Sequence, residues 1–147
     1  MQLTLYTDYS LRVLIYLGLK EDELATISEI ADSYNISRNH LVKVVHNLAN
    51  LGFIHTSRGK GGGMRLARPA RQINVGEVVR HTEPSFDIVE CFDKADPHCP
   101  INSMCRLKKV LEDASRNFIA ELDRYTLADV IGNQQELTKQ LNIVRFT

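Results

Sequence analysis

The chain has 147 residues, of which 44% are hydrophobic, so it is long enough to bury a core as a single soluble domain. Basic and acidic residues number 18 each, which excludes a uniformly basic or uniformly acidic protein. No apolar run approaches the length of a membrane-spanning helix, and no signal peptide is recognised at the start. We therefore expect a cytoplasmic protein with reduced thiols and no membrane partner.

Two helices are predicted at the start of the chain. A dense run of apolar residues predicts a largely buried helix over residues 7–19. A second helix is predicted to begin after Thr26, because a threonine followed three positions later by Glu29 is the signature of a capping box. This second helix is short and is expected to end near Tyr34.

A tight turn then leads into a third predicted helix. Asn35 suits a left-handed backbone conformation, and Ser37 suits the N-cap of a helix that runs to about Asn50. Helix, tight turn and helix together predict a helix-turn-helix unit. The apolar residues expected to face inward from the third helix are Leu41, Val44 or Val45, and Leu48.

A small β-hairpin is predicted after the third helix, because "FIHTS" and "MRLA" have the pattern of short strands and the segment between them is rich in glycine. Charge is distributed unevenly around it. Residues 33–76 contain no acidic residue, while arginine, lysine and histidine recur there. Acidic residues gather further along the chain, at Glu83, Asp87, Glu90, Asp93 and Asp96. The zero net charge therefore hides a basic part and an acidic part of the chain.

A basic third helix followed by a basic hairpin is typical of a winged helix-turn-helix that binds double-stranded operator DNA. A basic run alone would more often be ordinary solvated surface, so its position in this unit carries the inference. We expect Arg38 and Asn39 to contact bases, and the other DNA-facing residues to support them. The full set of expected DNA-binding residues is Arg38, Asn39, His40, Lys43, Asn47, Arg58, Lys60 and Arg65.

Further helices are predicted in the second half of the chain. One covers residues 75–82, and a long one runs from Ser103 to about Arg124 with an apolar stripe of coiled-coil spacing. A stripe of this length has to be covered, and a second copy of the chain is the simplest partner. A helical tail is expected to open at the cap residue Thr126.

The predicted fold class is therefore mainly α with a small β-hairpin, a winged helix-turn-helix domain joined to a long dimerisation helix. Four segments are expected. They are a DNA-binding domain over residues 1–80, a cysteine-rich loop over 81–105, a dimerisation helix over 106–125 and a helical tail over 126–147.

All three cysteines of the chain, Cys91, Cys99 and Cys105, lie in the loop before the long helix. The gaps of seven and five residues between them are wider than those of most structural zinc sites, and they suit an iron-sulfur cluster. Zinc with His98 as the fourth ligand and three metal-free thiols remain alternatives. No arrangement of serine, histidine and aspartate or of paired carboxylates stands out, so we expect no enzymatic activity.

Several segments together resemble the nitric-oxide-sensitive branch of the winged-helix iron-sulfur repressors. They are "MQLTLYTDYSLRVLIYL", "SRNHLVKVVHNLA", "RGKGGGMRLARPA", "INVGEVVR", the three-cysteine loop and "YTLADV". The resemblance covers nearly the whole chain. The gap between the first two cysteines is longer than in the cluster-biogenesis regulators of the same family, which makes that branch a poorer match.

The resemblance implies a homodimer that represses genes for handling nitrosative stress and responds to nitric oxide. It implies an iron-sulfur cluster held by Cys91, Cys99 and Cys105, with 4Fe-4S favoured and 2Fe-2S as the alternative. It also implies that a carboxylate near the N-terminus of the partner subunit supplies the fourth ligand, and the matching position is Asp8. Other signals that such regulators could sense include oxygen, cellular iron and cluster status.

Overall fold

The computed structural model describes residues 1–94 and 98–146, so Asp96 of the acidic segment lies outside the described residues. Helices dominate the chain and a two-stranded hairpin is inserted between them, which confirms the predicted fold class. The elements in chain order are α1 (Leu5–Lys20), α2 (Ile27–Tyr34), α3 (Arg38–Asn50), β1 (Ile54–Ser57), β2 (Gly63–Leu66), the short 3-10 helix η1 (Ala70–Gln72), α4 (Val75–Thr82), the short 3-10 helix η2 (Glu90–Phe92), α5 (Arg106–Leu122), α6 (Leu127–Val130) and α7 (Gln134–Gln140).

Local sequence signals set the helix-turn-helix. The Thr26 hydroxyl accepts a hydrogen bond from the Glu29 amide at 3.2 Å, and the Glu29 carboxylate accepts one from the Thr26 amide at 2.5 Å. This reciprocal pair is the predicted capping box, and it satisfies two amides at the start of α2. Asn35 ends α2 in the left-handed conformation, with φ of 54° and ψ of 50°. The predicted turn is confirmed.

Two details at helix ends differ from expectation. Ser37 is the N-cap residue of α3, but its side chain makes no capping hydrogen bond. The long helix α5 begins at Arg106 rather than Ser103 and ends at Leu122 rather than Arg124. The later start follows from Cys105, whose sulfur accepts a hydrogen bond from the Lys108 amide and so caps the helix.

The wing is an antiparallel hairpin in which Ile54 pairs with Leu66 and Ser57 with Gly63. Ala25, in the loop between α1 and α2, extends the hairpin because its backbone exchanges hydrogen bonds with that of Met64 at 2.9 and 2.8 Å. The wing is therefore tied to the helix-turn-helix through backbone as well as side chains.

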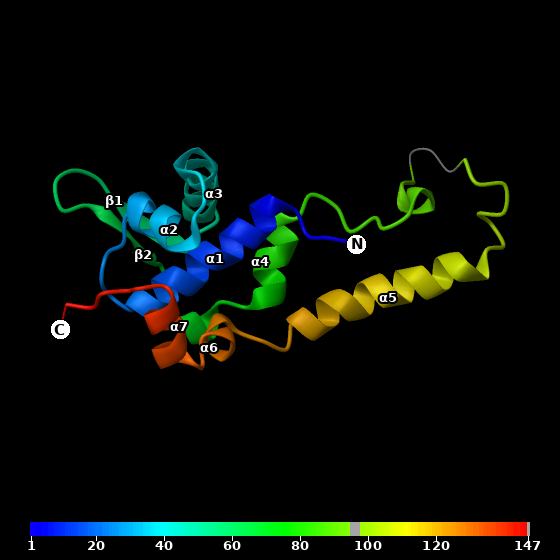
Figure 1. Ribbon diagram of the computed structural model, residues 1–147. Helices are drawn as coiled ribbons and strands as arrows, with labels where there is room; N and C mark the ends of the chain where they lie inside the picture. The colour runs from blue at the N-terminus through cyan, green and yellow to red at the C-terminus, as the bar shows by residue number, and fades with distance from the viewer. Residues whose placement is uncertain (95–97, 147) are drawn as a thin grey trace.

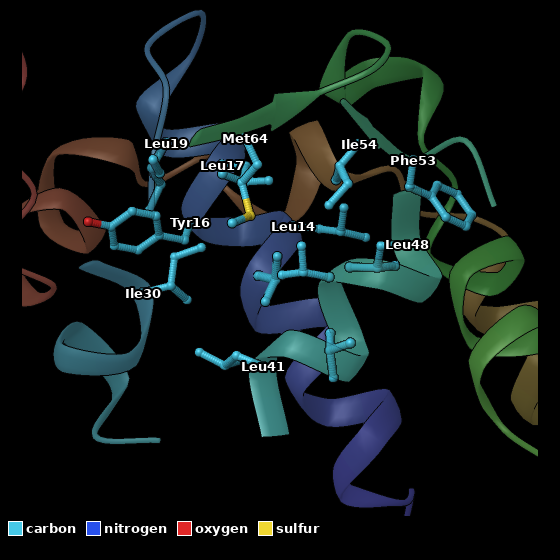
Figure 2. Close-up of a cluster of buried hydrophobic side chains, with 14 of the residues drawn as sticks. Leu14, Tyr16, Leu17, Leu19, Ile30, Leu41, Leu48, Phe53, Ile54 and Met64 are labelled. Atoms are coloured by element: carbon cyan, nitrogen blue, oxygen red, sulfur yellow. The ribbon is translucent and has the colours of Figure 1, made fainter. Parts of the chain in front are cut away.

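The core gathers around α1, as Figure 2 shows for Leu14, Leu17, Leu48 and Phe53. These four side chains come from α1, α3 and the start of the wing, and each is at most 1% exposed. Burying them against one another helps to fix α3 and the wing relative to α1.

The C-terminal segment belongs to the same core, which the sequence pattern did not indicate. Leu141 and Ile143 are buried beside residues of α1 and α2. Lys20, which is only 3% exposed, donates a hydrogen bond to the Val144 carbonyl at 3.2 Å, and the Ser33 hydroxyl donates one to the Leu141 carbonyl at 3.1 Å. The tail therefore braces the first two helices.

The helix α5 is different. It extends away from the body as an arm, and the cysteine loop lies at its distal end (Figure 1). None of its residues is buried. Within the part of the chain that the structure describes, no helix is both long and apolar enough to cross a membrane.

Candidate nucleic-acid interface and metal centre

The outer face of α3 carries the polar residues predicted to meet DNA. Arg38, Asn39 and Lys43 are exposed, while Leu41, Val44, Val45 and Leu48 are all buried. The apolar spacing of the helix therefore turns the polar face toward solvent, as expected. Arg38 and Asn39 lie in the first turn, where side chains of a recognition helix approach base edges.

One flank of α3 is in contact with α1. Asn47 is half-buried and lies beside Tyr6 of α1. Burial raises the pKa of Tyr6, and the Asn47 side chain partly lowers it again. The His40 ring stacks at a tilt against Tyr9, with 6.1 Å between ring centroids. Two of the residues predicted to meet DNA therefore also hold α3 against α1.

The wing presents the remaining predicted residues. Arg58, Lys60 and Arg65 are all exposed. The tip depends on glycine, because Gly59 and Gly61 have φ of 90° and 77°, a region that other residues rarely adopt. The turn therefore presents the basic side chains of residues 58 and 60 from a tight backbone conformation that requires glycine at the neighbouring positions.

Five basic side chains of this surface are free to meet an anion. Among the described residues, none of them takes part in an ion pair, whereas Arg68 at the base of the wing pairs with Glu77 at 3.0 Å. The five are Arg38, Lys43, Arg58, Lys60 and Arg65. A surface of unpaired cations suits a polyanion such as the phosphate backbone of DNA.

Asp8 lies in the first turn of α1 and forms a two-bonded ion pair with Arg12, at 2.7 and 3.1 Å. The Arg12 guanidinium also lies over two tyrosine rings, at 5.7 Å from the centroid of Tyr9 and 5.8 Å from that of Tyr34. Burial raises the pKa of Tyr34 to about 12, although the nearby positive charge of Arg12 lowers it.

Arg12 therefore connects Asp8 to the end of α2. Neither Arg12 nor Tyr34 was predicted from the sequence to belong to this site. The spacing of four residues between Asp8 and Arg12 was the available signal, because residues at this spacing meet on one face of a helix.

The three cysteines are free thiols at separate places on the loop. Cys91 lies in η2 and is partly buried, Cys99 is exposed, and Cys105 caps α5 with its sulfur 3.4 Å from the Lys108 amide nitrogen. Within the described ranges, no three histidine, cysteine, aspartate or glutamate side chains are close enough to hold a metal ion. Neither Asp8 nor His98 is part of such a group.

The donor set nevertheless fits an iron-sulfur cluster in its chemistry. Three thiols without a disulfide are the ligands that such clusters take, and the start of α5 favours negative charge. The fit lies in the chemistry of the donors and not in a preformed geometry of the described residues.

A helix-turn-helix with a basic wing, joined to an arm that carries thiols, defines a winged-helix transcriptional regulator. Residues 3–133 match the Rrf2 family, described as an iron-dependent transcriptional regulator. The chain therefore belongs to the Rrf2 family.

Relatives of known name agree with this assignment. The chain is 51% identical over 143 residues to the HTH-type transcriptional regulator NsrR of Bacillus licheniformis, covering 97% of this chain and 100% of the relative. It is 50% identical over 144 residues to NsrR of Bacillus subtilis, covering 97% and 99%. These names are those of regulators, which confirms the expectation that the chain is not an enzyme.

Solved structures share the fold. CymR, the global cysteine regulator of B. subtilis, is similar with a TM-score of 0.69 and 25% identity, covering 90% of this chain and 98% of the other. IscR of T. potens is similar with a TM-score of 0.73 and 23% identity, covering 93% and 90%. The predicted resemblance to the winged-helix iron-sulfur regulators is confirmed at the level of family and fold.

Proposed function

We propose that the chain is a cytoplasmic, homodimeric transcriptional repressor whose iron-sulfur cluster senses nitric oxide and controls binding to operator DNA. The observation that carries the proposal concerns the arm, which is α5 together with the cysteine loop. It combines an uncovered apolar face with three free thiols at its distal end, in a chain about half identical to regulators named NsrR. The predicted segment boundaries at residues 80, 105 and 125 are kept as part of this proposal.

The exposed apolar face of α5 supports the homodimer. Leu107 and Val110 are 62% and 61% exposed, and Met104 just before the helix is 78% exposed. Apolar side chains lined up on the exposed face of a helix are unfavourable in water. A second α5 covers them with a face of the same chemistry.

Cys91, Cys99 and Cys105 would hold the cluster, and the partner subunit's Asp8 would complete its ligation. Within one subunit Asp8 belongs to the body, while the cysteine loop lies at the end of the arm (Figure 1). A dimer built along α5 can carry each loop toward the body of the other subunit. When bound, such a cluster supplies a centre that is sensitive to nitric oxide and is shared between the subunits.

The contacts of Asp8 suggest how occupancy of this site reaches the DNA-binding face. If the Asp8 carboxylate moves away from Arg12 to bind the cluster, the guanidinium loses the negative charge that holds it beside Tyr9 and Tyr34. Tyr34 is the last residue of α2, and Tyr9 contacts His40 of α3. The position of the helix-turn-helix on α1 therefore depends on where the Asp8 carboxylate lies.

On the DNA, α3 would enter the major groove, with Arg38 and Asn39 at base edges. Lys43, Lys60 and Arg65 would meet phosphates, and Arg58 at the wing tip would enter the minor groove. His40 and Asn47 would contact DNA from the flank that they share with α1. Two such units, one from each subunit, suit an operator with two half-sites.

Nitric oxide provides the direct test of this function. Protein purified without air should show the visible absorbance of an iron-sulfur cluster and should retard a duplex selected by the protein from a random-sequence pool. A nitric-oxide donor should remove the absorbance and release the duplex over the same range of dose. Colourless protein that binds the same duplex equally tightly would contradict the proposal. Zinc without iron in elemental analysis would replace it with a zinc-stabilised regulator.

The ligand role of Asp8 has a matched control in Arg12. Asp8→Ala removes both the carboxylate and the ion pair, whereas Arg12→Ala removes the ion pair and the contacts of Arg12 with Tyr9 and Tyr34 but keeps the carboxylate. We expect faster loss of cluster absorbance to a chelator for Asp8→Ala, and close to wild-type behaviour for Arg12→Ala. Equal rates in the two variants would exclude a ligand role for Asp8.

A further inference from the structure

Val42 is an apolar side chain on the outer face of α3. It is 51% exposed, while its neighbours Leu41 and Val44 are each 1% exposed. Among the described residues of the helix-turn-helix over 26–50, it is the one large hydrophobic side chain that is exposed. The core therefore does not account for Val42, which contributes little to packing.

Helix geometry gives Val42 its neighbours. Residues three and four positions apart share one face of a helix, so Arg38, Asn39 and His46 surround Val42 on the outer side. All three are exposed. The opposite flank of the helix is the one held against α1 through His40 and Asn47. Val42 therefore lies on the open flank, directly beside the two side chains proposed to contact base edges.

Exposure by itself is weak evidence, because single apolar residues are common on protein surfaces. The position is what matters here. Valine is less favourable in an exposed helix than alanine, lysine or glutamine, so a solvated face gains nothing from it. Within a surface that meets DNA, the isopropyl group has a chemical match in the C5 methyl group of thymine, which projects into the major groove.

We propose that Val42 is a specificity-determining residue that contacts the thymine methyl group at one position in each operator half-site. The inference rests on the proposed function, because it requires α3 to enter the major groove. It adds to that function a preference for thymine over cytosine and over uracil at the contacted position. Arg38 and Asn39 would contact neighbouring bases through hydrogen bonds, and Val42 would add an apolar contact.

The test uses the full-length protein and a duplex that it has selected from a random-sequence pool. Each thymine of the selected duplex is replaced in turn by deoxyuridine, which removes only the methyl group. Affinities are measured for the wild type and for Val42→Ala. Alanine favours the helix, so this exposed substitution should leave folding intact, and circular dichroism checks this. Val130→Ala, at another exposed valine on α6, is the matched control.

We expect uracil at one position per half-site to weaken wild-type binding about fourfold per methyl group, as the burial of one methyl-sized group implies. For Val42→Ala the same replacement should have a smaller effect, because the two γ-methyl groups of valine are missing and only the β-carbon remains. Val130→Ala should respond as the wild type does. The inference is wrong if the two proteins lose affinity equally at every thymine position.

A second selection separates this inference from the proposed function. If wild-type protein selects no sequence and Lys43→Ala changes no affinity, then α3 does not bind DNA and the function itself is wrong. If Lys43→Ala weakens binding while Val42→Ala selects the same sequences as the wild type, only the role of Val42 fails. We expect Val42→Asn to select duplexes in which one thymine per half-site is replaced.

Discussion

The body of the molecule and its arm differ in how far their apolar residues are buried. In the body, Leu14, Leu17 and Leu48 are completely buried, and α1 is packed by α3, α4, α6, α7 and the wing. In the arm, α5 buries none of its residues, although it too carries an apolar stripe. The same amphipathic pattern thus has two outcomes, and only the body completes its core within one chain.

This difference in burial indicates which part of the molecule can respond to a regulatory signal. The body is a well-packed unit, so small changes there are resisted. The arm carries the thiols and an uncovered face, so its position depends on what it contacts. We infer that the arm responds to the signal and that the body responds to the arm.

The largest expected effect is on the core. Leu14→Ala should lower the free energy of unfolding by about 2–5 kcal/mol, because it leaves a cavity at the centre of the body. Urea denaturation should show this loss at every protein concentration. Leu107→Ala in the arm should show a loss that shrinks on dilution, because it acts through the contact between subunits. Identical concentration dependence for the two variants would remove the distinction between body and arm.

The arm itself is tested by charge. Val110→Asp places a carboxylate on the exposed apolar face of α5, and we expect the protein to sediment as a monomer while the body keeps its helical content. Ala120→Asp adds the same charge to an exposed position outside the apolar stripe of α5 and should leave the dimer intact. A dimer that survives Val110→Asp would contradict the proposed interface.

Within the body, the two caps of the helix-turn-helix should differ. Thr26→Ala removes a hydroxyl that accepts a hydrogen bond from the Glu29 amide. The substitution should lower the free energy of unfolding by about 1 kcal/mol. Ser37→Ala should cost only a few tenths of a kcal/mol, because the Ser37 side chain makes no capping hydrogen bond. Thermal unfolding of both variants measures the difference. Equal losses would show that Ser37 caps α3 in solution.

The smallest expected effect lies at the junction of body and arm. Arg80 of α4 pairs with Asp123 just after α5 at 2.6 Å, and this hydrogen bond lowers the pKa of the Asp123 carboxyl. A lowered pKa in the folded state gives stability that is present at neutral pH and is lost as the pH falls through that pKa. Asp123→Asn should therefore melt slightly earlier than the wild type at neutral pH. In strong acid the two melting curves should coincide, and a constant difference would contradict this.

Much of the body could be predicted from the sequence, because its signals are local. Thr26 with Glu29 and the left-handed Asn35 set their elements through neighbours in the chain, and both predictions are confirmed. The packing of Leu141 and Ile143 against α1 could not be predicted, because nothing near them in the sequence specifies so distant a partner. The start of α5 was misplaced because the Cys105 sulfur, an uncommon cap, ends the loop.

The candidate site was predictable to a smaller degree. Helical spacing correctly turned Arg38, Asn39 and Lys43 outward. It could not show that Tyr6 and Tyr9 of α1 contact Asn47 and His40, because such contacts depend on how two helices pack. The DNA-binding set, the cysteine ligands and the role of Asp8 therefore stay predictions until they are measured.

Mixed dimers test the shared site most directly. Subunits carrying Asp8→Ala and subunits carrying Cys105→Ala are produced together, each with a different affinity tag. The mixed dimer is purified through both tags in succession, and its chelator-resistant absorbance is recorded. If Asp8 acts across the dimer, the hybrid keeps one complete site, formed by the cysteines of the first subunit and the aspartate of the second, and about half of the wild-type absorbance survives. If the hybrid loses its absorbance as fast as a dimer of either variant alone, then the two subunits do not share the site.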